Sequence, residues 1–323
     1  MEKKGELVSY RPDIKVVDCT IRDGGLINDF YFTDEFVKNL YEADVAAGVD
    51  YIEFGYKASK EIFDVNSFGK WKFCNEEDIR AIVGENNTDT KISVMADVGR
   101  CDFRKDIGPK SESVIDMIRV ATYINTIPAA VEMVNYCSDM GYETTLNIMA
   151  ISTATMEDIN IALSLIAESK ADTVYVSDSY GALYPEQIRG LVDKYLKVGE
   201  TFGKKVGIHA HDNQRLAYAN TIEACSVGAS LLDATMMGMG RGAGNCRLEL
   251  LLGFLRNPKY NLNPVYSFLE KDMLPLSKEH VWGPDVQYAI TGQQNQHPRT
   301  AIAFTNEGRT DYKTFYQQIL DRD

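Results

Sequence analysis

Two of the chain's four histidines stand two residues apart, at His209 and His211 in the segment GIHAHDN. Residues i and i+2 of a β-strand point to the same face, so a strand through this segment would present both imidazoles together. Two imidazoles on one face at a strand end make a natural chelate. The spacing therefore predicts a metal site, and the alternative is a pair of hydrogen-bonded histidines in the protein core.

Residues of two further segments could complete such a site. Asp23, in TIRDGG, offers a carboxylate, and Asn245, in the glycine-rich GMGRGAGN, offers an amide oxygen. With two imidazoles they form a mixed nitrogen and oxygen set, which suits Mn²⁺, Mg²⁺, Fe²⁺ or Zn²⁺. Arg22 is permanently charged and suits a developing enolate oxygen. The alternatives are an Arg22–Asp23 surface pair and a plain glycine-rich turn.

Five more residues are candidates for contact with a substrate. Glu53 and Arg119 lie in apolar runs, so their charges point either toward a substrate or into a structural ion pair. Asp178, in SDSYG, could bind substrate or orient a metal-ligating histidine. Tyr288 and His297 belong to the C-terminal region and could reach over the active site, although a purely structural role is the alternative for both.

Eight apolar runs recur along the chain, and most are continuous, as expected of strands buried on both faces. The predicted strands are residues 16–21, 51–56, 91–97, 114–122, 143–152, 173–178, 205–211 and 231–236. Helical patterns with capping residues and terminal glycines lie between them. The predicted helices are residues 34–47, 128–140, 155–169, 185–202, 214–227 and 247–256.

Strands that alternate with helices imply a parallel sheet. Eight such units over roughly 250 residues fit a closed barrel better than an open sheet. We therefore predict an α/β fold, a (β/α)8 TIM barrel at residues 1–256 with a small C-terminal helical appendage at residues 257–323. Enzymes of this architecture carry their catalytic residues at the C-terminal ends of the strands. Asp23, His209, His211 and Asn245 lie at or after the ends of the first, seventh and eighth predicted strands, as this rule requires.

Some segments depart from the regular alternation. Residues 101–113 are too short and broken for a full crossover helix, and residues 57–75 are long enough for a lid loop or an interface element. In the appendage, residues 265–278 and 312–321 have helical patterns, and the block HVWGPDVQYAITGQQNQHPRTAI between them is rich in turn residues.

The formal net charge is −13, which disfavours nucleic acid and anionic lipid as partners. No run of about 18 apolar residues predicts a membrane span. The six cysteines form no CxxC pair, and the N-terminal segment has no apolar signal-peptide core, so we expect reduced thiols in a cytoplasmic protein.

The segments DCTIRDGG, GIHAHDN and GMGRGAGN, in this order, resemble a superfamily of metal-dependent barrels. That superfamily includes 3-hydroxy-3-methylglutaryl-CoA lyase, 4-hydroxy-2-oxovalerate aldolase, isopropylmalate synthase and the pyruvate carboxyltransferases. RVAT at residues 119–122 and DSYGALYP at residues 178–185 are similar to its fourth and sixth strands. The resemblance spans residues 14–256 and is most pronounced for the 4-hydroxy-2-oxovalerate aldolases.

The resemblance implies roles for individual residues. Asp23, His209 and His211 would bind the metal, with Asn245 as a candidate fourth ligand, and Arg22 would polarise the substrate carbonyl or enolate. The shared chemistry of the family makes or breaks a carbon–carbon bond beside a metal-bound 2-oxo acid or acyl enolate, with the metal as Lewis acid and template.

The sequence also departs from the familiar members at the acid/base positions. Gly24 stands where the synthases carry an acidic residue, which favours the lyase and aldolase side. Leu26 and Tyr123 stand where the aldolases carry histidines, and the glycine loop lacks the cysteine of the acyl-CoA lyases. Because general acid–base help is worth about 10²–10⁴-fold, another group must serve. Our hypothesis is that Tyr123, Tyr288 or His297 transfers the proton.

We therefore expect a divalent-metal-dependent aldolase or lyase that acts on a small 4-hydroxy-2-oxo acid through pyruvate enolate chemistry. Mn²⁺ or Mg²⁺ is the expected metal, and Zn²⁺ or Fe²⁺ is the alternative. The enzyme alternative is a synthase that joins an acyl-CoA to a 2-oxo acid, and the non-catalytic alternative is a metal-binding barrel without aldolase activity. We also expect a homo-oligomer, in the simplest case a dimer.

Overall fold

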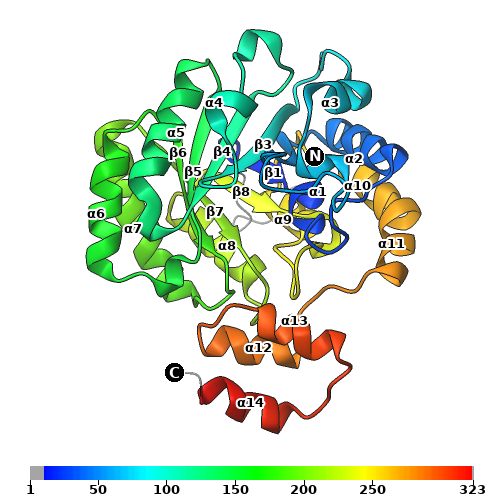
Figure 1. Cartoon of the computed structure of the whole chain (residues 1–323), viewed down its shortest axis with the longest axis vertical. Coiled ribbons are helices and arrows are strands. Elements are labelled where there is room, and N and C mark those ends of the chain that lie inside the picture. The colour runs from blue at the N-terminus through cyan, green and yellow to red at the C-terminus, as the bar shows by residue number, and fades with distance from the viewer. Residues whose placement is uncertain (1–10, 322–323) are drawn as a thin grey trace, which may run out of the picture.

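The computed structural model of the chain describes residues 11–321 and shows eight parallel strands closed into a barrel (Figure 1). The strands are β1 (Lys15–Asp18), β2 (Tyr51–Tyr56), β3 (Lys91–Asp97), β4 (Met117–Thr122), β5 (Glu143–Ile148), β6 (Thr173–Asp178), β7 (Lys205–Ala210) and β8 (Leu231–Ala234). Each strand pairs with its successor, and β8 pairs with β1 to close the ring. The predicted (β/α)8 barrel is confirmed.

Helices follow the strands and cover the outside of the barrel (Figure 1). They are α1 (Thr20–Gly24), α2 (Asp34–Ala47), α3 (Glu76–Val83), α4 (Phe103–Asp106), α5 (Ile127–Asp139), α6 (Met156–Ala167), α7 (Pro185–Phe202), α8 (Ala217–Val227) and α9 (Leu248–Leu255). Local signals set several of their ends. α2 begins after Thr33, whose hydroxyl accepts a hydrogen bond from the Phe36 amide (3.2 Å), and ends at Gly48 in the left-handed conformation.

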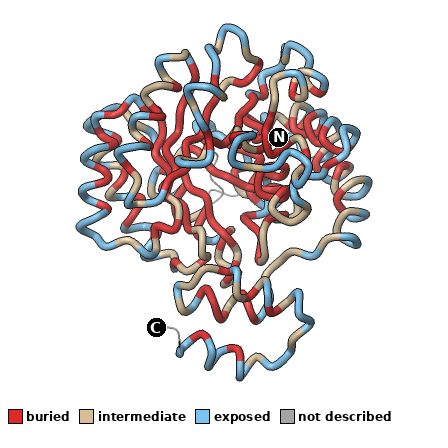
Figure 2. The backbone as a smooth tube through the Cα atoms, viewed as in Figure 1, coloured by how far each residue is buried: buried red, intermediate tan, exposed pale blue. Residues whose placement is uncertain are grey.

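The strands are buried on both faces, which explains their continuous apolar sequences (Figure 2). Every residue of β4 and of β6 is buried. Outward-facing aliphatic side chains pack beneath the helices in one large apolar cluster. A smaller apolar cluster of Val17, Cys19, Tyr51 and Met117 is separate from it. Polar and charged residues occupy further interior positions, so they must find partners there.

The fourth strand was predicted from residue 114 but begins at Met117. Three other predicted strands run two or more residues past the observed C-terminal end. The first ends at Asp18, because the Asp18 carboxylate accepts a hydrogen bond from the Thr20 amide (2.7 Å) and turns the chain into α1. Arg22 and Asp23 therefore lie on a short buried helix. The fifth ends at Ile148, and Ala150 beyond it is left-handed. The eighth ends at Ala234 before a 3₁₀ turn at Met236–Gly238.

The irregular crossovers largely follow expectation. Only α4 and a 3₁₀ turn at Lys110–Glu112 lie between β3 and β4, so the weak third crossover is confirmed. Residues 57–75 contain one short 3₁₀ turn and pack on the segment after α1, where the Gly69 amide donates to the Asp29 carbonyl (2.8 Å). None of them lines the cavity described below, so the structure does not place a lid there. Helix α3 was not among the predicted helices.

The C-terminal region divides into two parts. Helices α10 (Leu262–Phe268) and α11 (Leu274–Glu279), joined by a π-helical turn, pack on the barrel and share its apolar cluster through Val265 and Phe268. Helices α12 (Val286–Gln293), α13 (Arg299–Asn306) and α14 (Tyr312–Leu320) form a separate small core (Figures 1 and 2). The predicted division at residue 256 stays a prediction; α10 and α11 share the core of the barrel, whereas α12 to α14 have a core of their own.

The expectation of a turn-rich block between the C-terminal helical fragments is wrong, because this block forms α12 and α13. Both helices are eight residues long and are stabilised by tertiary packing around Ile290, Ala301 and Phe304, which their sequences do not reveal. Most of the N-terminal segment on which the signal-peptide expectation rests, residues 1–10, lies outside the described residues. Within residues 11–321, no helix combines the length and apolar character needed to cross a bilayer.

Candidate active site

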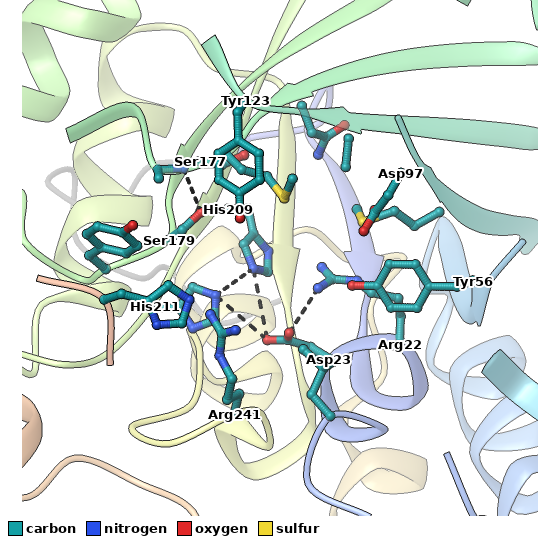
Figure 3. Close-up of a pocket in the computed structure, with 18 of the residues that line it drawn as sticks. Arg22, Asp23, Tyr56, Asp97, Tyr123, Ser177, Ser179, His209, His211 and Arg241 are labelled. Atoms are coloured by element: carbon teal, nitrogen blue, oxygen red, sulfur yellow. Dashed lines mark hydrogen bonds and ion pairs between the residues drawn. The ribbon is translucent and has the colours of Figure 1, made fainter. Parts of the chain in front are cut away.

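A cavity of about 220 Å³ lies at the C-terminal ends of the strands. Six of the predicted site residues line it, namely Arg22, Asp23, Tyr123, His209, His211 and His297. They come from α1, from the ends of β4 and β7, and from the C-terminal helical unit. Figure 3 shows Asp23, His209 and His211 grouped at the base of this cavity. This end of the barrel is where enzymes of the fold place their chemistry.

Asp23, His209 and His211 offer three ligand atoms that all lie within 4.8 Å of one another. The Nε2 atoms of the two histidines are 3.3 Å apart, and each is 4.0 Å from the Asp23 Oδ2 atom. Ligands about 2.1 Å from one ion and at right angles to each other would be about 3 Å apart. The three side chains are thus close to the spacing of a chelate, and all three are buried.

A carboxylate orients the first histidine. The Nδ1 atom of His209 donates to Asp233 Oδ2 (3.0 Å), which leaves the lone pair of Nε2 facing Asp23 and His211. A carboxylate behind a ligating imidazole fixes its tautomer and raises its basicity. Burial opposes the charge of Asp233, but Arg119 and His209 outweigh it and lower the pKa of Asp233 to about 2.

The other two residues of the group are also held in the forms that bind metals. Burial, followed by the neighbouring His209 and Arg241, lowers the pKa of His211 to about 3, although Asp23 opposes this shift. Burial would raise the pKa of Asp23, but Arg22 and the two histidines hold it well below its usual range. A neutral imidazole and an ionised carboxylate are the species that coordinate a divalent cation.

The glycine loop after β8 brings Asn245 to the same place. Asn245 forms a β-bridge with His211, and its Nδ2 donates to the Asp23 carboxylate and to the Met239 carbonyl (3.0 Å). Its Oδ1 atom is buried without a partner among the described residues. A Cβ on Gly240 would lie 2.1 Å from Asn245 Nδ2 and 2.8 Å from Asp23 Oδ2, so only glycine fits there.

These observations show that the residues fit a divalent metal. The donor set consists of two imidazoles, that of His211 neutral, together with an ionised carboxylate and an amide oxygen without a partner among the described residues. Such a set suits Mn²⁺, Mg²⁺, Fe²⁺ or Zn²⁺ without selecting one of them. An unpaired oxygen atom in a buried site is costly, and coordination would satisfy it.

Arg22 is fixed beside this group by two carboxylates. Its Nε donates to Glu53 Oε2 (2.8 Å) and its Nη1 donates to Asp23 Oδ1 (2.9 Å). No hydrogen bond joins its Nη2 to any residue in the described chain. Because a guanidinium stays protonated, this group can stabilise a developing enolate next to the metal ligands.

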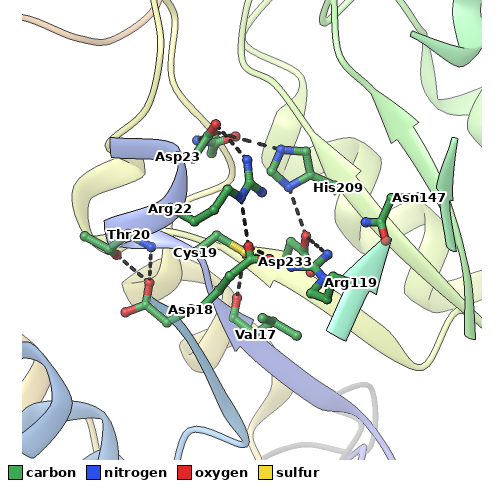
Figure 4. Close-up of polar contacts among 12 residues, drawn as sticks. Val17, Asp18, Cys19, Thr20, Arg22, Asp23, Arg119, Asn147, His209 and Asp233 are labelled. Carbon is green, nitrogen blue, oxygen red and sulfur yellow. Dashed lines mark hydrogen bonds and ion pairs between the residues drawn. The ribbon is translucent and has the colours of Figure 1, made fainter. Parts of the chain in front are cut away.

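Glu53 and Arg119 belong to an ion-pair network and do not line the cavity. Figure 4 shows Arg119 beside Asp233, with His209 on the other side of Asp233. Arg119 donates to Glu53 Oε2 (3.0 Å) and to Asp233 Oδ2 (2.5 Å), and both arginine and glutamate are fully buried. The network runs from Arg22 through Glu53, Arg119 and Asp233 to His209. Of the two alternatives for Glu53 and Arg119, the structure shows the ion pair, so contact with substrate is not supported.

Asp178 does not orient a histidine. Its carboxylate accepts hydrogen bonds from the Ala182 (3.0 Å) and Leu183 (3.2 Å) amides and closes the loop after β6. The reason is the alternation of the strand, since Ser177 lines the cavity and Asp178, the next residue, faces the other way. Burial raises the pKa of Asp178 to about 7. The orienting role predicted for Asp178 is filled by Asp233.

Tyr288 also lies elsewhere. It packs in the core of the C-terminal unit, and its hydroxyl is 3.4 Å from the Thr305 hydroxyl. It is not among the residues that line the cavity. His297 lines the cavity and packs edge-on against Tyr180, with ring centroids 5.4 Å apart. Tyr123 is exposed, and its hydroxyl has no hydrogen bond to a described residue.

Several cavity residues were not predicted. Asp97, which ends β3, has an Oδ1 atom without a partner in the described chain, and burial raises its pKa. Arg241 and Arg299 also line the cavity. Asp97 and Asp233 could have been suspected, because each is a carboxylate in an otherwise apolar strand. The sequence did not indicate Arg299 as a cavity residue, because the residues around it have the pattern of turns although they form a helix.

The comparisons with known proteins agree with this geometry. Residues 13–267 match the model of the HMGL-like family. The chain belongs to the HMGL-like family. A 4-hydroxy-2-oxovalerate aldolase of Pelotomaculum thermopropionicum is 30% identical over 78% of this chain and 72% of its own length. An oxaloacetate decarboxylase of Mycobacterium tuberculosis is 28% identical over 82% of this chain and 77% of its own length.

A solved structure extends the comparison to three dimensions. The N-terminal domain of an aldolase candidate from Bacteroides vulgatus is 28% identical, with a TM-score of 0.78 over 90% of this chain and 96% of that domain. The predicted family resemblance is thereby confirmed. The protein is an enzyme of the lyase type found in this family, and Asp23, His209 and His211 form a group that could hold a metal ion.

Proposed function

We propose that the protein is an aldolase that cleaves a small 4-hydroxy-2-oxo acid into pyruvate and an aldehyde, or joins the two in reverse. The observation that carries the proposal is the placement of Arg22 beside Asp23, His209 and His211 at the base of one cavity. The relatives named 4-hydroxy-2-oxovalerate aldolase support the choice of substrate class. We propose Mn²⁺ or Mg²⁺ as the metal, held by Asp23, His209, His211 and the Asn245 oxygen.

The reaction requires three events at the substrate. A base removes the proton of the 4-hydroxyl group, the C3–C4 bond breaks to release the aldehyde, and the electron pair moves into the C2 carbonyl to give the enolate of pyruvate. Arg22, held by Glu53 and Asp23, stabilises the negative charge on that oxygen. A proton then returns to C3. The metal, when bound, supplies Lewis acidity and a template for the 2-oxo acid.

We propose Asp97 as the base. It lines the cavity, one of its oxygens has no partner in the described chain, and burial raises its pKa, which makes the carboxylate a stronger base. His297 suits the opposite role. Its Nδ1 accepts the Arg299 amide (3.0 Å), so the proton of the neutral ring stays on Nε2, where it can be donated. Tyr123 remains a second candidate for proton transfer at the open side of the cavity.

A second reaction follows from the same enolate. Decarboxylation of oxaloacetate breaks a carbon–carbon bond to give pyruvate enolate and CO₂, and it needs no base at a hydroxyl group. Leu26, which lines the cavity where the aldolases carry a histidine, favours this reaction, as does the relative named oxaloacetate decarboxylase. We further propose a dimer in the cytoplasm, and the six free, buried cysteines suit a reducing compartment.

The test measures pyruvate release from a panel of 4-hydroxy-2-oxo acids, and from oxaloacetate, with lactate dehydrogenase as the coupling enzyme. We expect release that requires added Mn²⁺ or Mg²⁺ and falls to background in Asp23→Asn. Asp139→Asn is the matched control, because Asp139 forms an exposed pair with Lys170 far from the metal ligands. No pyruvate from any substrate would overturn the proposal, and release of CoA from an acyl-CoA with 2-oxo acids would favour the synthase.

A further inference from the structure

One side of the cavity carries two guanidinium groups that the proposed chemistry does not use, Arg241 from the glycine loop and Arg299 at the start of α13. Together with the neutral His297 just before α13, proposed above as a proton donor, we call them the basic rim. Arg22 already serves the reacting end of the substrate through its bonds to Asp23 and Glu53. In Figure 3, Arg22 and Arg241 approach Asp23 from opposite sides. The rim is thus a second cationic region.

Among the described residues, the side chains of Arg241 and Arg299 have no protein partner, and Arg299 is exposed. Within residues 11–321, no carboxylate lies within 4.0 Å of Arg241 or of Arg299, and the Nε atom of Arg241 is buried without a hydrogen bond. A buried donor without an acceptor is unfavourable unless a ligand supplies one.

His297 adds a neutral donor to these charges. Its Nδ1 accepts the Arg299 amide (3.0 Å), so Nε2 carries the proton of the neutral ring. Burial, followed by Arg241 and Arg299, lowers the pKa of His297 to about 4, which keeps the ring neutral at physiological pH. Two guanidinium groups and an imidazole N–H are thus donors without an acceptor in the part of the chain that the structure describes. Carboxylate and phosphate oxygens are the acceptors that arginines bind best.

We propose that the basic rim binds an anionic group at the far end of the substrate. The substrate is then a dianion, a 2-oxo acid whose aldehyde-derived half ends in a carboxylate or a phosphate. This inference rests on the proposed function, because the reacting end must lie at Asp23, His209 and His211. The C-terminal helical unit then takes part in substrate binding, because two of the three rim residues, His297 and Arg299, lie just before α13 and at its first position.

The test compares aldol addition of pyruvate to matched aldehydes. Succinic semialdehyde against butanal reports a carboxylate, and glyceraldehyde 3-phosphate against glyceraldehyde reports a phosphate. We expect the anionic member of at least one pair to have the higher kcat/KM, and the preferred pair identifies the anion. In Arg241→Gln and Arg299→Gln this preference should fall about 10- to 100-fold. Arg241→Lys should retain part of it, because the charge remains while the planar fork is lost.

Arg104→Gln is the matched control, because Arg104 forms an exposed pair with Glu132 on the outside of the barrel and should leave the preference unchanged. Equal kcat/KM values within both pairs would overturn the inference. So would an Arg241→Gln variant that loses the same factor for charged and neutral aldehydes, because Arg241 would then bind the carboxylate of pyruvate instead.

A binding measurement separates this inference from the proposed function. Calorimetric titration with inorganic phosphate and with succinate requires no turnover, and we expect one of them to bind more weakly to Arg241→Gln than to the unaltered protein. Metal-dependent exchange of the pyruvate methyl protons with D₂O reports the enolate chemistry alone. If the methyl protons of pyruvate exchange but neither anion binds at the rim, the inference is refuted. If an anion binds at the rim but the methyl protons do not exchange, the proposed function is refuted.

Discussion

Replacement of Asp233 by asparagine tests how the metal site is built. Asp233 accepts from His209 Nδ1 (3.0 Å) and from Arg119 Nη2 (2.5 Å), so its charge both orients a metal ligand and balances a buried guanidinium. The variant Asp233→Asn keeps the size of the side chain and an acceptor oxygen but removes the charge. We expect two separate losses, one in metal affinity and one in stability.

The magnitudes follow from the two contacts. Loss of a carboxylate behind a ligating histidine lowers metal affinity about 10–100-fold. Removal of one partner from a buried ion pair costs about 3–5 kcal/mol. Glu53 Oε2, 3.0 Å from Arg119, retains part of the charge balance, so the lower end, about 3 kcal/mol, is expected. At roughly 2 °C per kcal/mol for a chain of this length, the Tm should fall by about 6 °C.

The assay measures Mn²⁺ affinity by calorimetry and Tm on metal-free protein. Two controls separate the effects. Asp178→Asn should leave Mn²⁺ affinity unchanged, because that carboxylate accepts backbone amides of the loop after β6. Asp139→Asn should change neither quantity, because its pair with Lys170 is exposed. If Asp233→Asn binds Mn²⁺ as tightly as the unaltered protein, or if Asp178→Asn weakens it more, the assignment of Asp233 as the orienting carboxylate is refuted.

Three further predictions follow from the site. Arg22→Gln should lower kcat for pyruvate release about 10²–10³-fold, because the positive charge beside the enolate is lost. Steady-state kinetics with saturating Mn²⁺ measures this, and an unchanged kcat would contradict the role of Arg22. Gly240→Ala should weaken Mn²⁺ binding at least 10-fold, because its Cβ would meet Asn245 Nδ2 at 2.1 Å. Gly190→Ala in α7 is the control, because Gly190 has open space around it, and this variant should raise the free energy of unfolding by about 0.5–1 kcal/mol. In metal-free protein, burial lowers the pKa of His211 to about 3, so the unfolded chain alone binds this proton between about pH 3 and 6.5. The free energy of unfolding should therefore fall as pH drops through that range. Denaturant titrations at a series of pH values measure this, and the free energy of unfolding should depend less on pH in His211→Asn than in the unaltered protein.

The partial success of the sequence at the site has a physical explanation. His209 and His211 were predicted to share a face because a strand alternates every two residues whatever surrounds it. Glu53 and Arg119 could not be placed, because a charge in an apolar strand has the same local pattern whether it meets a substrate or another charge. Only the register of β2, β4 and β8 shows that they meet each other and Asp233.

Local periodicity, capping residues and glycine positions by themselves determined the eight strands and most of the helices around the barrel. The types and spacing of Arg22, Asp23, His209 and His211 predicted that these residues meet at one end of it, and the cavity brings them together. These patterns span only a few residues, and they favour the same local structure whatever surrounds them. The tertiary structure alone decided that Asp233 rather than Asp178 orients His209, that Tyr288 lies in a separate core, and that α13 brings Arg299 to the cavity beside Arg241. Those outcomes depend on the relative register of strands and on the packing of short helices, because contacts between residues far apart in the chain set both.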